Sequence, residues 1–493
     1  MDDKEVIARS LPPPMDVAVD GNFAGKLTPH LMAELRGWIA LPLIALGLAG
    51  LLALLLAAAR VPGAELILPW TGPEAFRRIL VVHVTFAFVV WYLGVQGVLT
   101  VVATAQVVAE RGATDQESDL GGFEAFFGRV AVYGAGLSFV LLLIPALGNV
   151  GTPSINNYIP VLLHPLYYAG LGLLAACVAL PIIRLLLLLA RRRRPDAGVF
   201  GVACAGVIYL LALVCIGAAW LTIPKYVGVE GAAEYVMWGG GHVLQFANTA
   251  LMLCGLYFIV RVALGETPMT PKWFAAAMLM LVAGAGAGPL LYLTFVGGDP
   301  SQRMTFTSLY WFALPVPATL VMASVVGLLF KRRRDLWDGA PEIKGVIAAL
   351  VLFAVGGLIG FFEGSVDTRT PAHYHAMLIA VTLVFMTLYF GLFLPLAGRR
   401  TPRRRLRTAM YVLLGLGQLL HSGGLYVAGM EGVVRKAAGA DQDLDNVTKI
   451  AAMATEGVGG LIAVIGGIIF IVLAARLLLA RQATGVTPGA STR

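Results

Sequence analysis

Charged residues are scarce in this chain, and their scarcity decides its class. Asp, Glu, Lys and Arg make up only 13% of the 493 residues, whereas an average soluble protein carries about a quarter. Hydrophobic residues reach 58% and gather in runs of roughly 20 or more, separated by short charged loops. In lipid such runs must be helical, because each segment has to satisfy its own backbone hydrogen bonds. We therefore expect an all-α, multi-pass membrane protein, and no nucleic-acid partner.

Cysteine is also rare. The four cysteines all lie inside apolar runs and form no CxxC pair; they are Cys177, Cys204, Cys215 and Cys254. This usage indicates neither a disulfide framework nor a zinc site and favours packing roles. The first 36 residues are polar and contain proline, so we expect no signal peptide.

Twelve transmembrane helices are expected. They lie near residues 37–59, 79–108, 128–148, 158–190, 198–222, 233–262, 273–297, 304–330, 345–363, 371–397, 408–430 and 450–480. The organisation that follows is a tail at 1–36, a twelve-helix membrane domain at 37–481 and a tail at 482–493.

The basic residues predict the orientation. If both termini lie inside, 27 of the 36 Lys and Arg fall on the inner side and 9 on the outer side. Short loops rich in Lys and Arg stay in the cytoplasm. We therefore expect an inner (cytoplasmic) membrane protein with both termini cytoplasmic.

Six of the seven histidines fall in apolar runs, and this topology puts all six in the outer half of the membrane. They are His83, His164, His242, His373, His375 and His421, whereas His30 belongs to the polar tail. An imidazole in lipid is costly without a partner, so intramembrane histidines are functional candidates. Six at one depth indicate ligands around buried metal or haem.

The sequence His373-Tyr374-His375 carries the most chemistry. Residues i and i+2 of an α-helix point about 200° apart, so one helix can offer an imidazole on each side. His83 on another helix is a natural second axial ligand to one of two haems. Two axial histidines suit electron transfer, whereas one histidine with an open position makes a reactive haem.

This pattern resembles the haem-copper oxidase superfamily, in particular subunit I of cytochrome c oxidase, with the nitric oxide reductases as relatives. Besides the early helix 2 histidine and H-x-H, the matching motifs are Trp238-Gly239-Gly240-Gly241-His242 (W-x-x-G-H), Asp367-Thr368 (D-T before H-x-H) and Gly429-Met430 followed by Arg435-Lys436 (G-M and basic residues). The resemblance covers nearly the whole chain.

The resemblance implies two haems, of a type that the sequence does not specify. His83 and His375 would ligate a low-spin haem and His373 a high-spin haem, while Arg435 and Lys436 would face the propionates. Electrons would pass from the first haem to the second, which would reduce a small gaseous molecule, most simply dioxygen. Implied partners are other membrane subunits and a donor such as cytochrome c, a cupredoxin or a quinol.

The chain departs from the family at the second metal. In the family, copper or non-haem iron is held by the helix 6 histidine and by an adjacent His-His pair. This sequence contains no His-His pair. Alignment through Gln302–Ser308 puts Leu291 and Tyr292 at the pair, and Phe246 where common oxidases have a redox tyrosine. His242 and Tyr292 therefore join His373 as candidate catalytic residues.

Whether His242 binds a second metal stays open. Copper wants about three nitrogen ligands, so either His164 or His421 completes a rearranged site or copper is absent. Three functions follow: an oxidase-like enzyme, a nitric oxide reductase-like enzyme, or a two-haem electron-transfer cytochrome that has lost the second metal. A transporter is less favoured, because it leaves H-x-H unexplained.

Overall fold

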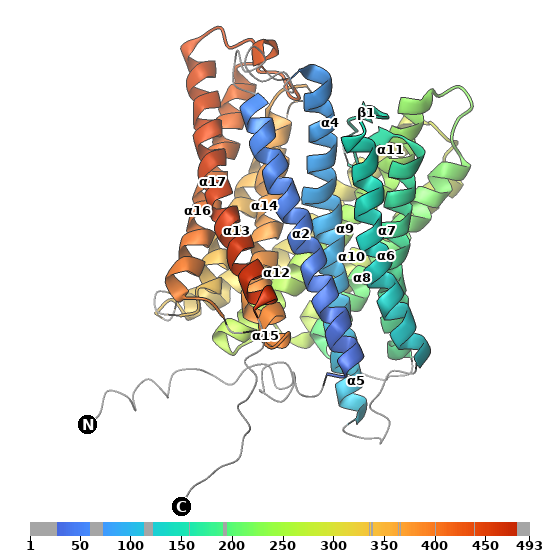
Figure 1. Cartoon of the computed structure of the whole chain (residues 1–493), viewed down its shortest axis with the longest axis vertical. Helices are drawn as coiled ribbons and strands as arrows, with labels where there is room; N and C mark the ends of the chain where they lie inside the picture. The colour runs from blue at the N-terminus through green and yellow to red at the C-terminus, as the bar shows by residue number, and fades with distance from the viewer. Residues whose placement is uncertain are drawn as a thin grey trace, which may run out of the picture.

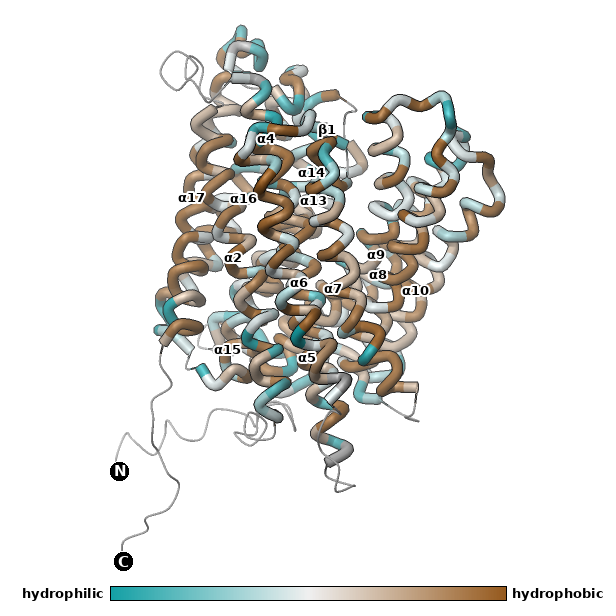
Figure 2. The backbone as a smooth tube through the Cα atoms, turned by 45° about the vertical axis from the view of Figure 1, so that its right-hand side comes forward, coloured by the Kyte–Doolittle hydropathy of each residue, from teal (hydrophilic) through white to brown (hydrophobic). Residues whose placement is uncertain are grey.

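A computed structural model gives the structure of the chain. It describes residues 27–59, 72–112, 122–156, 158–190, 195–334, 336, 339–362, 364, 366–399, 401–437 and 439–480. Within them, twelve helices are long and apolar enough to cross a membrane, as predicted. They stand side by side as one bundle (Figure 1), with hydrophobic residues along the helices and hydrophilic ones gathered toward the two ends (Figure 2). The predicted fold class is confirmed.

The elements follow one another in a simple order. They are α2 (Pro29–Ala59), α4 (Pro73–Val84), η3 (Thr85–Val90), α5 (Trp91–Gly112), α6 (Gly122–Leu147), β1 (Thr152–Ser154), β2 (Val161–Leu163), α7 (Pro165–Ala190), α8 (Ala197–Leu221), α9 (Val229–Leu264), α10 (Pro271–Thr294), α11 (Pro300–Ala313), α12 (Pro315–Lys331), α13 (Glu342–Gly360), α14 (Arg369–Leu388), η4 (Tyr389–Phe393), α15 (Leu394–Leu396), α16 (Arg404–Met430), η5 (Gly439–Gln442) and α17 (Val447–Leu479). The second, eighth and tenth spans are each built from consecutive helical pieces.

The first span begins eight residues earlier than predicted, at Pro29. Thr28 caps this helix, because its hydroxyl accepts from the backbone N–H of Leu31 at 3.3 Å. The added turns hold Glu34, whose two carboxylate oxygens accept from Arg184 of α7 at 2.8 and 2.9 Å. Both side chains are buried, so this bidentate pair satisfies two charges that lipid would otherwise penalise.

The fourth span begins seven residues later than predicted. Residues 158–164 form part of an antiparallel hairpin in which Thr152 pairs with Leu163 and Ser154 with Val161. The helix starts only at Pro165. Proline favours the first helical position and disfavours helical backbone in the residue before it, so the apolar run is split at that point.

Two π-helical stretches interrupt the spans. η3 begins at Thr85, two residues after His83, and η4 lies near the end of the tenth span. Such one-turn irregularities are frequent at functional sites. η3 thus sets the direction of the chain just beyond one candidate ligand.

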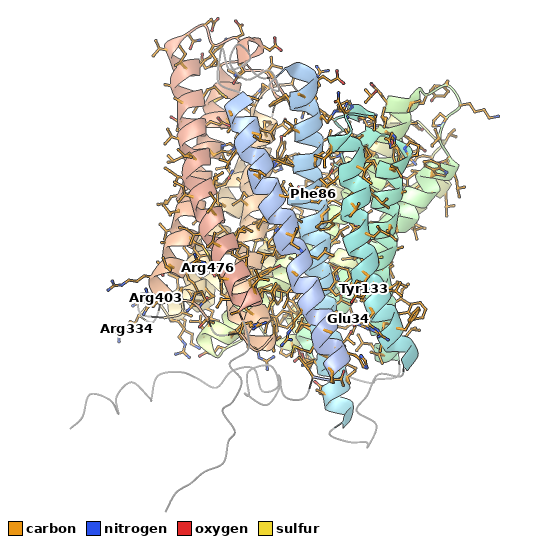
Figure 3. The ribbon with its side chains drawn as sticks, viewed as in Figure 1. Glu34, Phe86, Tyr133, Arg334, Arg403 and Arg476 are labelled. Carbon is orange, nitrogen blue, oxygen red and sulfur yellow. The ribbon has the colours of Figure 1, made fainter. Side chains whose placement is uncertain are left out.

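Three connections meet at one end of the bundle. The hairpin β1–β2 and the start of α4 lie there (Figure 1). The backbone N–H of Thr368, before α14, donates to the carbonyl of Val433, after α16, and Asp367 forms a β-bridge with Val434. The opposite end carries Arg334 and Arg403 (Figure 3). The bundle thus has a histidine-bearing end, where these connections meet, and an opposite, arginine-bearing end.

Candidate functional site

Three candidate histidines share one hydrogen-bonding arrangement. In each, Nδ1 lies within 2.9 Å of a backbone carbonyl oxygen: His83 on Ala49, His242 on Trp238 and His373 on Gly356. A carbonyl can only accept, so Nδ1 carries the proton and Nε2 the lone pair. Metal-ligating histidines are oriented in this way. The donor set therefore fits haem iron, which His83 and His373 would hold through Nε2.

The two histidines of H-x-H face different helices, as their spacing predicts. His373 bonds to α13, where Gly360 leaves room for the ring: a Cβ there would lie 2.7 Å from Nδ1. The ring of His375 meets that of His421 on α16, with centroids 4.8 Å apart and an interplanar angle of 64°. One helix therefore presents imidazoles to two compartments of the bundle.

His421 belongs to the compartment of His375. Its Nδ1 lies 3.1 Å from the backbone oxygen of Glu456 and 3.5 Å from a carboxylate oxygen of the same residue on α17. Glu456 is buried. These contacts hold His421 beside His375, so they lend no support to a triad that His421 forms with His242.

The prediction that His164 lies in the fourth helix is wrong. His164 precedes the helix, where its carbonyl accepts from the backbone N–H of Tyr167 and its Nδ1 from that of Leu166. Pro165 is the cause, because the helix begins there. His164 thus lies just before the first residue of α7, and its side chain is half-buried instead of lying deep in the bundle.

Sequence reasoning missed the main partner of His242. Tyr158, from the loop between β1 and β2, places its hydroxyl 2.9 Å from Nε2 of His242. His242 is only 2% exposed. A second hydroxyl, that of Thr307, lies 3.5 Å from the same nitrogen. The signal that could have found the loop is Asn156 followed by Pro160, a turn pattern at the start of the apolar run.

The positions aligned with the missing His-His pair hold no imidazole. Tyr292 packs on Phe306 with ring centroids 5.7 Å apart, and a Cβ on Gly239 would lie 2.2 Å from its hydroxyl. The carbonyl of Leu291 accepts from Gln302 at 3.2 Å. Among the described residues, no three or more His, Cys, Asp or Glu side chains gather as a metal site would require. The chemistry of these donors does not fit copper.

A second residue that sequence reasoning missed is Arg303. Its guanidinium carbon lies 4.0 Å from the ring centroid of Trp238, one turn before His242. The same group forms an ion pair with Glu234. A cation over an indole face is attractive, so this contact fixes Trp238 and, through its carbonyl, His242.

The D-T and G-M motifs, 62 residues apart, come together in space. The hydroxyl of Thr368 donates to the carbonyl of Leu425 at 2.7 Å, and Asp367 forms an ion pair with Arg369 at 2.8 Å. Gly429 lies against these two residues, since a Cβ there would be 2.6 Å from the backbone nitrogen of Arg369 and 3.0 Å from a carboxylate oxygen of Asp367. Arg369 holds the pKa of Asp367 below its usual range through a side-chain hydrogen bond.

The predicted propionate residues lie in this assembly. The backbone N–H of Arg435 donates to Val366 at 3.1 Å, and Nζ of Lys436 donates to the carbonyl of Ile155 at 3.0 Å. Burial, with a smaller effect of Arg435, lowers the pKa of Lys436 to about 8, against the opposing influence of Glu234. A half-buried cation with a depressed pKa suits an anionic ligand group.

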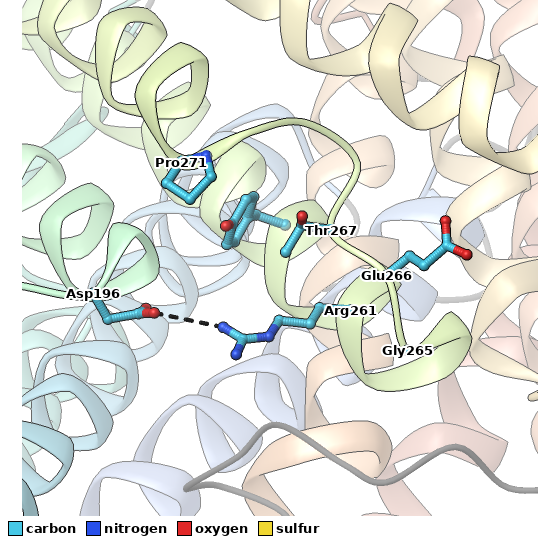
Figure 4. Close-up of a pocket in the computed structure, with 7 residues that line it drawn as sticks. Asp196, Arg261, Gly265, Glu266, Thr267 and Pro271 are labelled. Carbon is cyan, nitrogen blue, oxygen red and sulfur yellow. Dashed lines mark ion pairs between the residues drawn. The ribbon is translucent and has the colours of Figure 1, made fainter.

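Two hollows complete the picture. One of about 40 Å³ is lined by the polar side chains of Tyr92, Gln245, Asn248, Thr249 and Tyr310, and it lies one to two turns along α9 from His242. It has room and partners for about one water molecule. The other, about 490 Å³, is lined by Asp196 and Arg261, which form an ion pair at 3.5 Å (Figure 4). Arg261 lies 19 residues beyond His242 on one helix, so roughly 28 Å separates them.

All four cysteines are free and buried, as expected of packing residues.

Comparison with known proteins agrees with the geometry. The family described as "Cytochrome C and Quinol oxidase polypeptide I" matches residues 35–483. An uncharacterized protein of Rickettsia prowazekii is 24% identical over 498 residues, covering 90% of this chain and 95% of that protein. Cytochrome c oxidase subunit 1 of Thermus thermophilus is 25% identical over 338 residues, covering 61% of this chain and 60% of that protein.

Proposed function

Because the chain belongs to the family of cytochrome c and quinol oxidase polypeptide I, we propose that it is a membrane haem oxidoreductase of a respiratory chain. His83 and His375 hold a low-spin haem, and His373 holds a high-spin haem at which a small gaseous molecule, most simply dioxygen, is reduced. The organisation into a membrane domain at 37–481 with tails at 1–36 and 482–493 is part of this proposal.

One observation carries it: the anchoring of His83 and His373 through Nδ1. Each is fixed by a carbonyl of a neighbouring helix, Ala49 of α2 and Gly356 of α13, at 2.9 and 2.7 Å. Hydrogen bonds between helices fix both the tautomer and the direction of the ring. Such preorganisation is what an axial ligand needs.

The chain's other residues orient the cofactors. Arg435 and Lys436 bind propionate carboxylates at the histidine-bearing end. Burial there disfavours the charged form of Lys436 and lowers its pKa, so an anionic partner would stabilise that form. The edge contact of His421 keeps His375 in place. Bound haem would supply one-electron chemistry and, where one axial position is open, a site for a small ligand.

Members of this family work with other membrane subunits and electron donors. We propose a donor such as cytochrome c, a cupredoxin or a quinol, and an inner membrane location with both termini cytoplasmic.

A second candidate function is a two-haem electron-transfer cytochrome. The side chains aligned with the metal-binding pair favour it, since Leu291 has no donor atom and Tyr292 packs on Phe306. A nitric oxide reductase-like reaction remains the alternative that requires a second metal.

Spectra of purified variants test the assignment. His83→Ala or His375→Ala should abolish the six-coordinate low-spin spectrum, because each removes an axial ligand. His373→Ala should spare that spectrum and abolish carbon monoxide binding. His164→Ala is the matched control, since it removes an imidazole outside the helices and should change neither signal. Carbon monoxide binding that survives His373→Ala would contradict the assignment.

A further inference from the structure

The coordinating nitrogen of His242 already has a partner. Nδ1 donates to the carbonyl of Trp238 at 2.8 Å, so Nε2 offers the only lone pair in the plane of the ring. The Tyr158 hydroxyl lies 2.9 Å from it. The competing hydroxyl, that of Thr307, lies farther away and donates to the carbonyl of Arg303 at 3.1 Å. Tyr158 is therefore the donor to Nε2.

Tyr158 is held in place by its own loop. The Asn156 side-chain oxygen accepts from the backbone N–H groups of Tyr158 and Ile159, at 3.0 and 2.8 Å. On either side the loop continues into β1 and β2, whose pairing closes the hairpin. The backbone of the loop therefore aims the ring into the bundle.

Helix α9 is shaped to receive that ring. A Cβ on Gly241 would lie 2.5 Å from Cβ of Tyr158, so only glycine permits this approach. The ring meets Trp238 edge-on, with centroids 5.7 Å apart, and lies 4.5 Å from the imidazole centroid. Loop and helix are thus complementary around one hydrogen bond.

We propose that Tyr158 takes the coordination position on His242 that a second metal would need. The polar group at this site is then a metal-free tyrosine–imidazole pair. It offers hydrogen bonding where copper or non-haem iron would offer a second redox centre. This inference deepens the proposed function and rests on it, because it assumes a reactive haem at His373. Without a second redox metal, the protein should catalyse at most slow four-electron reduction of dioxygen.

Metal content gives the first test. Protein produced with added copper and iron should contain no copper or non-haem iron beyond the level in His242→Gln, measured by elemental analysis against haem. Wild-type protein that holds one equivalent of either metal, lost in His242→Gln, would overturn the proposal.

A second test reads the hydrogen bond itself. With ¹⁵N-labelled histidine, the Nε2 resonance assigned through His242→Gln should shift in Tyr158→Phe, which removes one oxygen and keeps the ring. Tyr292→Phe is the matched control, because Tyr292 packs on Phe306 and Gly239 instead; it should leave the resonance unchanged. An unchanged Nε2 resonance in Tyr158→Phe would overturn the pair.

The two proposals can fail separately. Protein that contains no haem would refute the proposed function, yet the resonance would still report on Tyr158 and His242. Protein with both haems and a metal on His242 would refute the pair alone.

Discussion

At the residue scale, Lys436 is a group whose charge depends on what the site contains. Burial lowers its pKa to about 8 from the ordinary 10.5. Below about pH 8 Lys436 is charged in the folded state, and its burial then lowers the free energy of unfolding. As the pH rises from about 8 toward 10.5, the folded protein loses this proton before the unfolded chain does, so the destabilisation decreases. Stability attributable to this residue rises with pH across that window, because the unfolded chain binds more protons there.

We predict that haem-free protein, obtained from a haem-deficient host, becomes more stable as the pH rises from about 7.5 to about 10, a range that covers most of the interval between the folded and unfolded pKa values of Lys436. The Lys436→Met variant should not show this increase in stability. The difference should be on the order of 1 kcal/mol after allowance for solvent screening. Thermal unfolding followed by circular dichroism measures it. Lys272→Met, which removes an exposed lysine, is the control and should keep the wild-type slope.

The same comparison on haem-loaded protein tests the propionate role. A carboxylate against Lys436 raises its pKa again, so the wild-type slope should approach that of Lys436→Met. A slope that haem leaves unchanged would contradict contact between Lys436 and a propionate.

At the scale of elements, α16 and α17 pack with their backbones in close approach. A Cβ on Gly424 of α16 would lie 2.5 Å from the backbone nitrogen of Glu456 on α17, and one on Gly417 would lie 2.4 Å from that of Ala463. Small residues at such interfaces let membrane helices approach closely. His421 lies between these two glycines in sequence, so the same packing brings it to Glu456.

We predict that Gly424→Ala destabilises the protein, whereas Gly423→Ala does not. The first methyl group meets backbone, which cannot move aside, and overpacking of this kind costs about 1–3 kcal/mol. The second meets nothing within 4 Å. Both substitutions change helix propensity equally, so the difference in thermal midpoint in detergent isolates the contact. Equal midpoints would argue against this interface.

These glycines also show where sequence reasoning ends. Hydrophobic runs predicted twelve spans and the 200° separation predicted different neighbours for His373 and His375, because both depend on local periodicity. Which of two adjacent glycines touches a partner depends on the helix pairing, and the run itself does not encode it.

Tyr158 shows the same limit at the candidate site. It belongs to no motif and lies 84 residues from His242. The apolar run at 158–190 predicts one helix, although its helical part begins only at Pro165. Only the hairpin, a contact between two short strands, brings this hydroxyl to the imidazole.

At the scale of the whole molecule, the two ends of the bundle differ in chemistry. At one end, three segments are joined by hydrogen bonds. Lys436, after α16, donates to the carbonyl of Ile155 in the hairpin, and the backbone N–H of Thr368, in the loop before α14, donates to the carbonyl of Val433. The candidate ligands His373 and His375 follow that loop within the first turns of α14. Arg334 and Arg403 lie at the other end (Figure 3). The excess of basic residues there predicts that it faces the cytoplasm.

Cysteine labelling tests this orientation. Asp441 and Arg403 are exposed at opposite ends of the chain's last long hairpin, α16–α17, and the four native cysteines are buried, so their background should be low. A membrane-impermeant maleimide should label Asp441→Cys in intact spheroplasts, because η5 faces outward. It should label Arg403→Cys only in inverted vesicles or after permeabilisation. The reverse pattern would place the candidate haem ligands in the inner half of the membrane, where a periplasmic donor such as cytochrome c could not reach them directly.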